Sequence, residues 1–284
     1  MEEFLSIASK QISPYLKTKI IIAPHAGYSY SGSTAAFAYA AIDAQNVDTI
    51  FLLGPSHHEY LGSACALSSC SVYETPLGDI PLNTSILDRL ERSSNAFKRM
   101  NIKTDTDEHS LEMHLPFIKK VMADSSFTLV PILVGSPTME TETNLAKVLA
   151  PYLENPKALF IISSDFCHWG ERFRFTSSSI DIPIHESIKQ LDNRGMELIA
   201  EKGIVLINHN NLYCVDHEGF LKYLEKTENT ICGRYPILLM LKTLQFVSDP
   251  SKYSIEFVKY AQSSQVTDPR DSSVSYASAI VRKK

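Results

Sequence analysis

The sequence predicts a single α/β domain with a central mixed or parallel sheet and helices on both faces. Short β-branched runs alternate with stretches of helical periodicity, which is typical of α/β layer structures. No Pro/Ser/Gly-rich linker, low-complexity tract or internal repeat divides the 284 residues. The composition, 44% hydrophobic and 21% charged, is sufficient for a sizeable core. We therefore expect one domain over residues 1–284.

The expected strands are short runs rich in β-branched and aromatic residues. They cover residues 19–23, 49–53, 127–134, 158–163, 254–260 and 274–281. Pro131 lies inside the third run, and because proline has no backbone N–H to donate, it indicates a β-bulge or an edge position there.

The expected helices follow the 3.6-residue spacing of apolar side chains. They cover residues 33–42, 84–93, 140–153, 185–192, 217–226 and 235–246. Ser33 is the expected N-cap of the first helix, because a hydroxyl can accept a hydrogen bond from a free N–H of the first turn. The last helix is apolar nearly all round, so it should be buried against the sheet.

Charge and hydropathy exclude several classes of protein. The net charge is −5 and no basic run offsets it, which argues against nucleic-acid binding. No apolar stretch approaches the roughly 20 residues that span a bilayer, so no membrane insertion is expected. The acidic N-terminus lacks the features of a signal peptide. Five cysteines without a CxxC pair should be free thiols, and we expect a cytoplasmic protein with access to the nucleus.

Histidines follow three of the predicted strands. His25 comes after the first strand, His57 and His58 after the second, and His168 after 158–163. Because ligands gather at the carboxyl ends of strands in open α/β sheets, a metal centre is the leading hypothesis. The spacing leaves open whether His57 or His58 faces the site, since neighbouring residues in an extended chain point opposite ways.

The segment 163–170 is dense in polar side chains. Asp165 and His168 are three residues apart, so one turn of helix would place them on the same side. A carboxylate beside an imidazole fixes its tautomer and suits proton transfer. The structural alternative is an aspartate N-cap followed by the packed side chain of Trp169.

The segment 108–116 contains two further histidines. His109 and His114 are five residues apart, which turns them away from a common helix face and excludes a zinc-protease HExxH motif. At most one of them should face the pocket. The neighbouring acids Asp105, Asp107 and Glu108 are expected in a solvated loop.

Cys232 precedes the apolar helix 235–246. A thiol at a helix N-terminus has its thiolate stabilised by the helix dipole, which suits a nucleophile or a ligand. The structural alternative is a small buried hydrophobe. Arg234 is placed to stabilise an anion. Two imidazoles with one anionic ligand form the facial-triad arrangement, which leaves metal positions open for substrate.

These residues and their surroundings closely resemble the Memo family, named for mediator of ErbB2-driven cell motility. The matching segments are 24–32, 53–58, 108–116, 163–170, 231–234 and 260–265. The resemblance covers nearly the whole chain from about residue 19 and implies a fold similar to the class III extradiol dioxygenases, which use non-haem Fe(II). A family segment of Ser-His-Ala-Gly-Ser-Trp-Tyr character ahead of the first strand is missing from this sequence, so we expect a more open pocket.

The resemblance implies roles for individual residues. His25, His57 and Cys232 fall on the metal-binding positions, for iron (Fe²⁺) or copper, which favours His57 over His58. By the same resemblance, His168 is an acid/base histidine, His109 a second active-site histidine, and Asp165 a residue that lines the pocket.

Three functions follow from the resemblance. The first is a metal-binding, redox-linked protein that acts in signalling and cell motility. The second is a metal-independent scaffold that binds a phosphotyrosine peptide or a receptor tail through a vestigial enzyme pocket. An active non-haem iron dioxygenase ranks last, because Cys232 stands where the dioxygenases place a glutamate, and a thiolate is easily oxidised.

Overall fold

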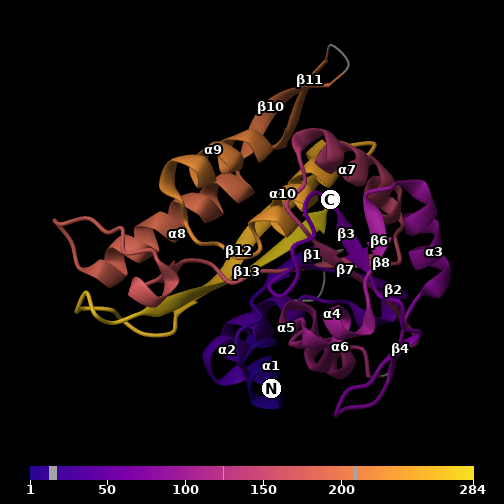
Figure 1. The fold of residues 1–284 in the computed structure, drawn as a ribbon, viewed down its shortest axis with the longest axis horizontal. Coiled ribbons are helices and arrows are strands. Elements are labelled where there is room, and N and C mark those ends of the chain that lie inside the picture. The colour runs from indigo at the N-terminus through magenta and orange to yellow at the C-terminus, as the bar shows by residue number, and fades with distance from the viewer. Residues whose placement is uncertain (13–17, 124, 208–209) are drawn as a thin grey trace.

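A mixed nine-stranded sheet forms the centre of the molecule (Figure 1). The structure is a computed structural model and describes residues 1–12, 18–123, 125–207 and 210–284. The strand order is β12-β13-β1-β8-β2-β7-β3-β6, and β9 pairs with β13. The bounds are β1 Thr18–Ala23, β2 Thr49–Pro55, β3 Cys65–Leu67, β6 Phe97–Arg99, β7 Thr128–Val134, β8 Ala158–Ser163, β9 His168–Trp169, β12 Tyr253–Gln262 and β13 Ser273–Lys283.

The middle of the sheet is parallel. β8 pairs in parallel with both β1 and β2, and β2 pairs in parallel with β7. On the flanks, β13 is antiparallel to β1, and β3 is antiparallel to β7. Every residue of β1, β2 and β8 is buried, as expected for parallel strands covered on both faces. The predicted α/β architecture with a mixed sheet is confirmed.

Helices cover the sheet, and the remaining strands form two small hairpins. The helices are α1 Glu2–Ala8, α2 Tyr28–Tyr39, α3 Thr84–Ser93, α4 Ile102–Asp107, α5 His109–Glu112, α6 Leu115–Val121, α7 Met139–Glu154, α8 Ile184–Ala200, α9 His217–Thr227 and α10 Arg234–Gln245. The hairpins pair β4 Val72–Tyr73 with β5 Ile80–Pro81 and β10 Lys202–Ile207 with β11 Asn210–Val215. Short 3-10 turns lie at Ala44–Asn46, Glu171–Phe173 and Pro250–Lys252.

The apolar helix α10 packs against the centre of the sheet. Helix α2 contacts β1 and β13 on the lower side in Figure 1. Helix α10 contacts α7, β2 and β8. The residues of α10 from Pro236 to Leu241 are all buried. The prediction of a helix buried against the sheet is therefore confirmed. In the part of the chain that the structure describes, no helix has the length and apolar character to cross a bilayer.

Two local expectations are wrong. The helix expected at residue 33 begins at Tyr28, with Gly27 as its N-cap, so Ser33 lies in its interior. The backbone carbonyl of Gly27 already accepts the N–H groups of Tyr30 and Ser31, which starts the helix one turn and a half earlier. This early start brings α2 against α1.

Pro131 causes neither a bulge nor an edge position. The β2–β7 register is continuous through Leu52 and Pro131, and β7 lies between β2 and β3. The ladder with β3 begins at Ile132, so Pro131 lies just beyond its end. The short partner strand explains why a proline is tolerated inside the sheet.

Stacked aromatic rings hold β2 and β8 together. The rings of Phe51 and Phe160 are 4.5 Å apart at 6°, and both side chains are buried. We expect Phe51→Ala to lower the free energy of unfolding by about 3–5 kcal/mol, because it removes buried apolar surface and leaves a cavity. Urea unfolding measures this, with the exposed Ile180→Ala as the control, expected within about 0.5 kcal/mol of wild type. Equal losses in the two variants would contradict this packing.

Candidate metal centre

The candidate site lies at the carboxyl edge of the central strands. His25, His57 and Asp165 each stand two residues beyond the end of β1, β2 and β8, respectively. Because β8 pairs in parallel with both neighbours, these ends meet at one edge of the sheet. The structure therefore brings together residues that are more than a hundred positions apart in the sequence.

His25 is buried and its tautomer is set by a hydrogen-bond chain. Its backbone N–H donates to Asp165 Oδ1 over 2.9 Å, and its Nδ1 lies 2.6 Å from Ser163 Oγ. The Ser163 hydroxyl already donates its proton to the carbonyl of Ser110, so it accepts the proton of Nδ1. Burial, and the nearby histidines after it, lower the pKa of His25, which keeps the ring neutral. Its Nε2 is thus an unprotonated donor atom for a metal.

Glu108 orients His57. Its carboxylate accepts the ring Nδ1–H of His57 at 2.8 Å, the backbone N–H of His57 at 2.7 Å and the N–H of Ser110 at 3.0 Å. Burial raises the pKa of Glu108, but these hydrogen bonds outweigh it and lower the pKa to about 2. An ionised carboxylate at Nδ1 leaves Nε2 of His57 free, as in carboxylate–histidine–metal arrangements.

Glu108 is buried, so the prediction that it lies in a solvated loop is wrong. Its side chain is 1% exposed and caps α5. Asp105 is half-buried and accepts a hydrogen bond from Tyr73, whereas Asp107 is exposed and pairs with Lys103. Both lie in α4 and not in a loop, so the expected exposure holds for Asp107 alone. The sequence does not reveal the role of Glu108, because the helix that Glu108 caps has only four residues.

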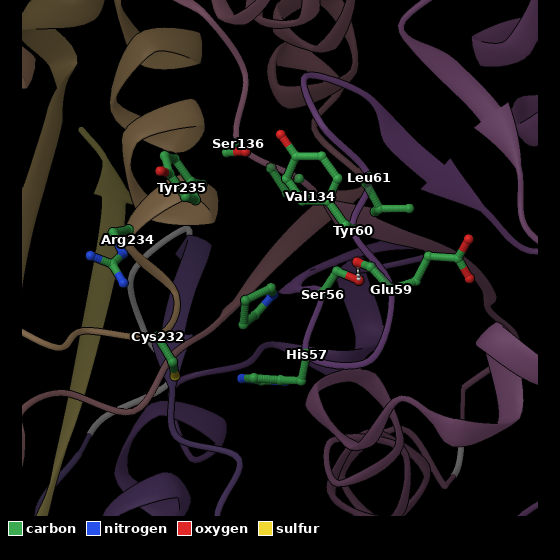
Figure 2. A pocket seen from close by; sticks show the side chains of 12 residues that line it. Ser56, His57, Glu59, Tyr60, Leu61, Val134, Ser136, Cys232, Arg234 and Tyr235 are labelled. Carbon is green, nitrogen blue, oxygen red and sulfur yellow. Dashed lines mark hydrogen bonds between the residues drawn. The ribbon is translucent and has the colours of Figure 1, made fainter. Parts of the chain in front are cut away.

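Cys232 completes the group. Its Sγ lies 3.4 Å from His25 Nε2 and accepts the backbone N–H of Asp165 at 3.2 Å. One ligand atom each from His25, His57 and Cys232 lies within 4.8 Å of the others, so these residues could hold a metal ion. In Figure 2 the His57 ring and the Cys232 side chain extend toward the same space.

The expected activation of Cys232 by the helix dipole does not occur. Desolvation, followed by the nearby Asp165, raises the pKa of the thiol above its ordinary value. The helix begins at Arg234, so Cys232 lies outside the first turn, where the dipole acts. In the absence of a cation the thiol is protonated.

Gly233 allows the loop that carries Cys232 to approach β8 closely. A Cβ at this position would lie 2.4 Å from the carbonyl oxygen of Ser163 and 2.4 Å from the Cβ of Ser164. The backbone N–H of Gly233 instead donates to Ser164 Oγ at 3.1 Å. The close contact places Cys232 next to the end of β8.

No helical turn joins Asp165 to His168. The residues between β8 and β9 form no helix, and His168 begins β9. Against the larger effect of burial, the charge of His168 still lowers the pKa of Asp165. The ring Nδ1 of His168 donates to the carbonyls of Phe166 and Thr230, at 2.9 and 3.1 Å. These bonds occupy Nδ1, so Nε2 is the nitrogen of His168 left for another partner. Asp165 is buried, which raises its pKa, and it holds the backbone of His25.

The two histidines of segment 108–116 differ in their surroundings, as the sequence predicts. The ring of His109 stacks on that of His57 at 4.5 Å, whereas His114 is buried and hydrogen-bonds the hydroxyl of Tyr39. One member of the 108–116 pair thus faces the site. His58 is exposed, and its ring lies 5.9 Å from that of His109. The structure brings His57, and not His58, to Cys232 and His25.

A cavity of about 260 Å³ opens beside His57 and Cys232 (Figure 2). Polar and aromatic side chains surround it, including Tyr60, which is 90% exposed, and Tyr235. Arg234 lines the same cavity, with its guanidinium 5.9 Å from the ring of Tyr235. The cavity thus combines the candidate metal ligands with a cationic side chain.

The loops of the site are fastened to α8 by the buried Asp192. Its carboxylate accepts hydrogen bonds from the backbone N–H of Cys167, the side chain of Asn229 and the hydroxyl of Tyr260. The first two donors belong to the segments that carry His168 and Cys232. Burial raises the pKa of Asp192 to about 6, although these hydrogen bonds and one from Ser275 lower it.

An α/β fold with two imidazoles and a thiol at the carboxyl edge of its sheet defines a protein with a candidate metal-binding pocket. A family profile described as Memo-like protein matches residues 1–280. The chain belongs to the Memo-like protein family.

Several curated relatives are similar over most of their length. Human protein MEMO1 is 44% identical over 263 residues, which are 91% of this chain and 84% of that protein. The zebrafish Danio rerio protein MEMO1 is 42% identical over 281 residues, 98% of this chain and 89% of that protein. The protein memo-1 homolog of Caenorhabditis elegans is 42% identical over 93% of this chain and 72% of its own length.

Among solved structures, an uncharacterized protein from Escherichia coli K12 covers 91% of this chain and 98% of its own. Its sequence is 12% identical, and the TM-score is 0.48. A TM-score of this size does not establish a common fold.

The stability of the site region should depend on the ionisation of Asp192. Because its folded pKa, about 6, lies above the ordinary value of 3.8, ionisation destabilises the folded chain. Wild type should therefore lose about 3 kcal/mol relative to Asp192→Asn between about pH 4 and pH 7. Urea unfolding across this range measures the difference, with the exposed Asp181→Asn as the control variant. A difference between wild type and Asp192→Asn that stays constant with pH would contradict a buried, raised-pKa carboxyl group.

Proposed function

We propose that this protein is a metal-binding, redox-linked protein that holds iron or copper at His25, His57 and Cys232. One observation carries the proposal. The protein uses Nδ1 of both histidines for its own hydrogen bonds, which directs Nε2 of each ring to the group formed with the Cys232 thiol. In a purely structural site, nothing would require both imidazoles to present the same nitrogen to one thiol.

The donor set fits such an ion. Two imidazoles and a thiolate suit Cu(I), iron and zinc, and three protein ligands leave positions open toward the cavity. When bound, the metal supplies one-electron redox chemistry and Lewis acidity. Among the residues of the chain, Glu108 fixes the His57 ring, and Nε2 of His168 is the ring nitrogen left for proton transfer. Asp165 positions the His25 backbone and the thiol.

The wider assignment rests on the family. The Memo resemblance supports a fold of the class III extradiol dioxygenase type and a role in signalling and cell motility. The free thiols of Cys65, Cys70, Cys167 and Cys232 support a cytoplasmic location with access to the nucleus. The side chain of the fifth cysteine, Cys214, lies outside those that the structure describes.

The first test is the metal content after anaerobic loading with Fe(II) or Cu(I). We expect near-stoichiometric metal in wild type and in Cys70→Ser, a half-buried cysteine outside the site, and loss of metal in Cys232→Ser. Retention by Cys232→Ser would show that the thiol is not an essential ligand. Absence of metal from all three proteins would reject the metal-binding proposal.

Glu108 should matter for metal affinity without being a ligand. We expect Glu108→Gln to weaken metal binding by about 10–100-fold, because the amide cannot accept all three N–H groups that orient His57. Competition with a chelator measures the change. The control is Glu112→Gln on the same short helix, for which we expect no change in affinity. Equal affinities of wild type and Glu108→Gln would contradict the role of Glu108.

A second candidate function is favoured by Arg234. Its guanidinium lines the cavity with Tyr60 and Tyr235, which suits a phosphotyrosine peptide or a receptor tail. Under this scaffold function, Arg234→Met should abolish binding of phosphotyrosine peptides, and Cys232→Ser should leave it intact. Turnover of a catechol by the Fe(II)-loaded protein in air would instead support an active dioxygenase.

A further inference from the structure

A second group of metal-ligating side chains lies beside the first and shares His57 with it. One ligand atom each from His57, Glu108 and His109 lies within 4.8 Å of the others. The first group adds His25 and Cys232 to the shared histidine, whereas the second adds an imidazole and a carboxylate. Because both groups contain His57, they are two neighbouring candidate positions for an ion beside its imidazole ring.

Glu108 contributes charge to the second group and not a free donor atom. Its Oε1 accepts both the His57 Nδ1–H and the N–H of Ser110, and its Oε2 accepts the backbone N–H of His57. These bonds also fix which nitrogen of His57 is available, because Nδ1 is occupied. Nε2 of His57 is therefore the one atom that can serve an ion in either position.

His109 lies between the solvent and the inner ligands. Its ring is nearly parallel to that of His57, at 25° and 4.5 Å, and its centroid is 5.5 Å from that of His25. The exposed fraction of the side chain is 46% for His109 and 27% for His57. The whole residue His25 is buried. The ring of His109 is therefore the more accessible of the two stacked imidazoles, and His25 is the inner one.

We propose that His109 and His57 form an outer entry position for the metal ion, from which it moves to the inner ligands. Nε2 of His57 stays bound while His25 and Cys232 replace His109, so the ion never loses all of its protein ligands. Coordination of the Cys232 thiol releases its proton to solvent. The negative charge of Glu108 favours a cation at the entry, and the added thiolate favours the inner position for a soft ion.

This inference rests on the proposed function and adds a route of loading to it. In this route His25 and Cys232 replace His109 while His57 stays bound. His109 should therefore affect the rate of loading, which distinguishes it from a final ligand. A final ligand sets the equilibrium affinity. An entry ligand lowers the barrier in both directions and leaves the equilibrium nearly unchanged.

Stopped-flow loading with Co(II), followed by its thiolate absorption band, tests this role. We expect His109→Ala to slow both uptake and release about tenfold, equivalent to about 1.4 kcal/mol on the barrier. The dissociation constant from equilibrium titration should change by less than about threefold. His58→Ala, which removes a neighbouring exposed imidazole outside both groups, is the matched control and should load at the wild-type rate.

Each other outcome counts against the entry position. An unchanged loading rate in His109→Ala would reject it, and so would an equal slowing in His58→Ala, which would indicate a general surface effect. A loss of affinity in step with the uptake rate would make His109 a final ligand. A wild-type chain that takes up no metal would reject this inference and the proposed function together, whereas normal loading of His109→Ala would reject the inference alone.

Discussion

The parallel pairing of β1, β8 and β2 is the constraint on which the site depends. Adjacent parallel strands end at the same edge of the sheet, so residues two positions beyond each strand meet there. The strands themselves are fully buried between helices, which holds their register firmly. A shift of one residue would exchange the faces of every side chain and separate the two histidines.

Hydrogen bonds then occupy the same ring nitrogen, Nδ1, in three of the imidazoles. Nδ1 of His25 donates to Ser163, Nδ1 of His57 to Glu108, and Nδ1 of His168 to backbone carbonyls. The partners are a hydroxyl, a carboxylate and amide oxygens, but the consequence is the same in each case. In each of these rings Nδ1 is occupied, so Nε2 is the nitrogen left for a metal ion or a proton.

The electrostatics of the site favour a bound cation. Burial lowers the pKa of His25 and raises the pKa values of Asp165 and Cys232, so these groups lean toward their neutral forms. Glu108 is the exception, since its hydrogen bonds keep it ionised. A cation near Cys232 would reverse the effect on the thiol, because it stabilises the thiolate directly. Without a metal ion, His25, Asp165 and Cys232 thus favour their neutral forms, and a bound cation would favour the thiolate of Cys232.

Much of the fold could be predicted from local pattern. The predicted strand 158–163 and helix 84–93 coincide with β8 and α3, and the other strongly periodic segments differ from the structure mainly at their ends. The shorter elements were missed. Helices α4, α5 and α6 have four to seven residues, too few to show a helical period in the sequence.

The sequence by itself determined the α/β architecture, the strand-end positions of His25 and His57, and the family to which the chain belongs. Tertiary structure decided the rest. Three features depend on loops that pack against one another. They are the burial of Glu108, the turn of His57 rather than His58 toward Cys232, and the hydrogen bonds of the His168 ring to backbone carbonyls. Local pattern cannot show such contacts, because the partners lie far apart in the chain and the direction of a side chain in a loop follows from its hydrogen bonds.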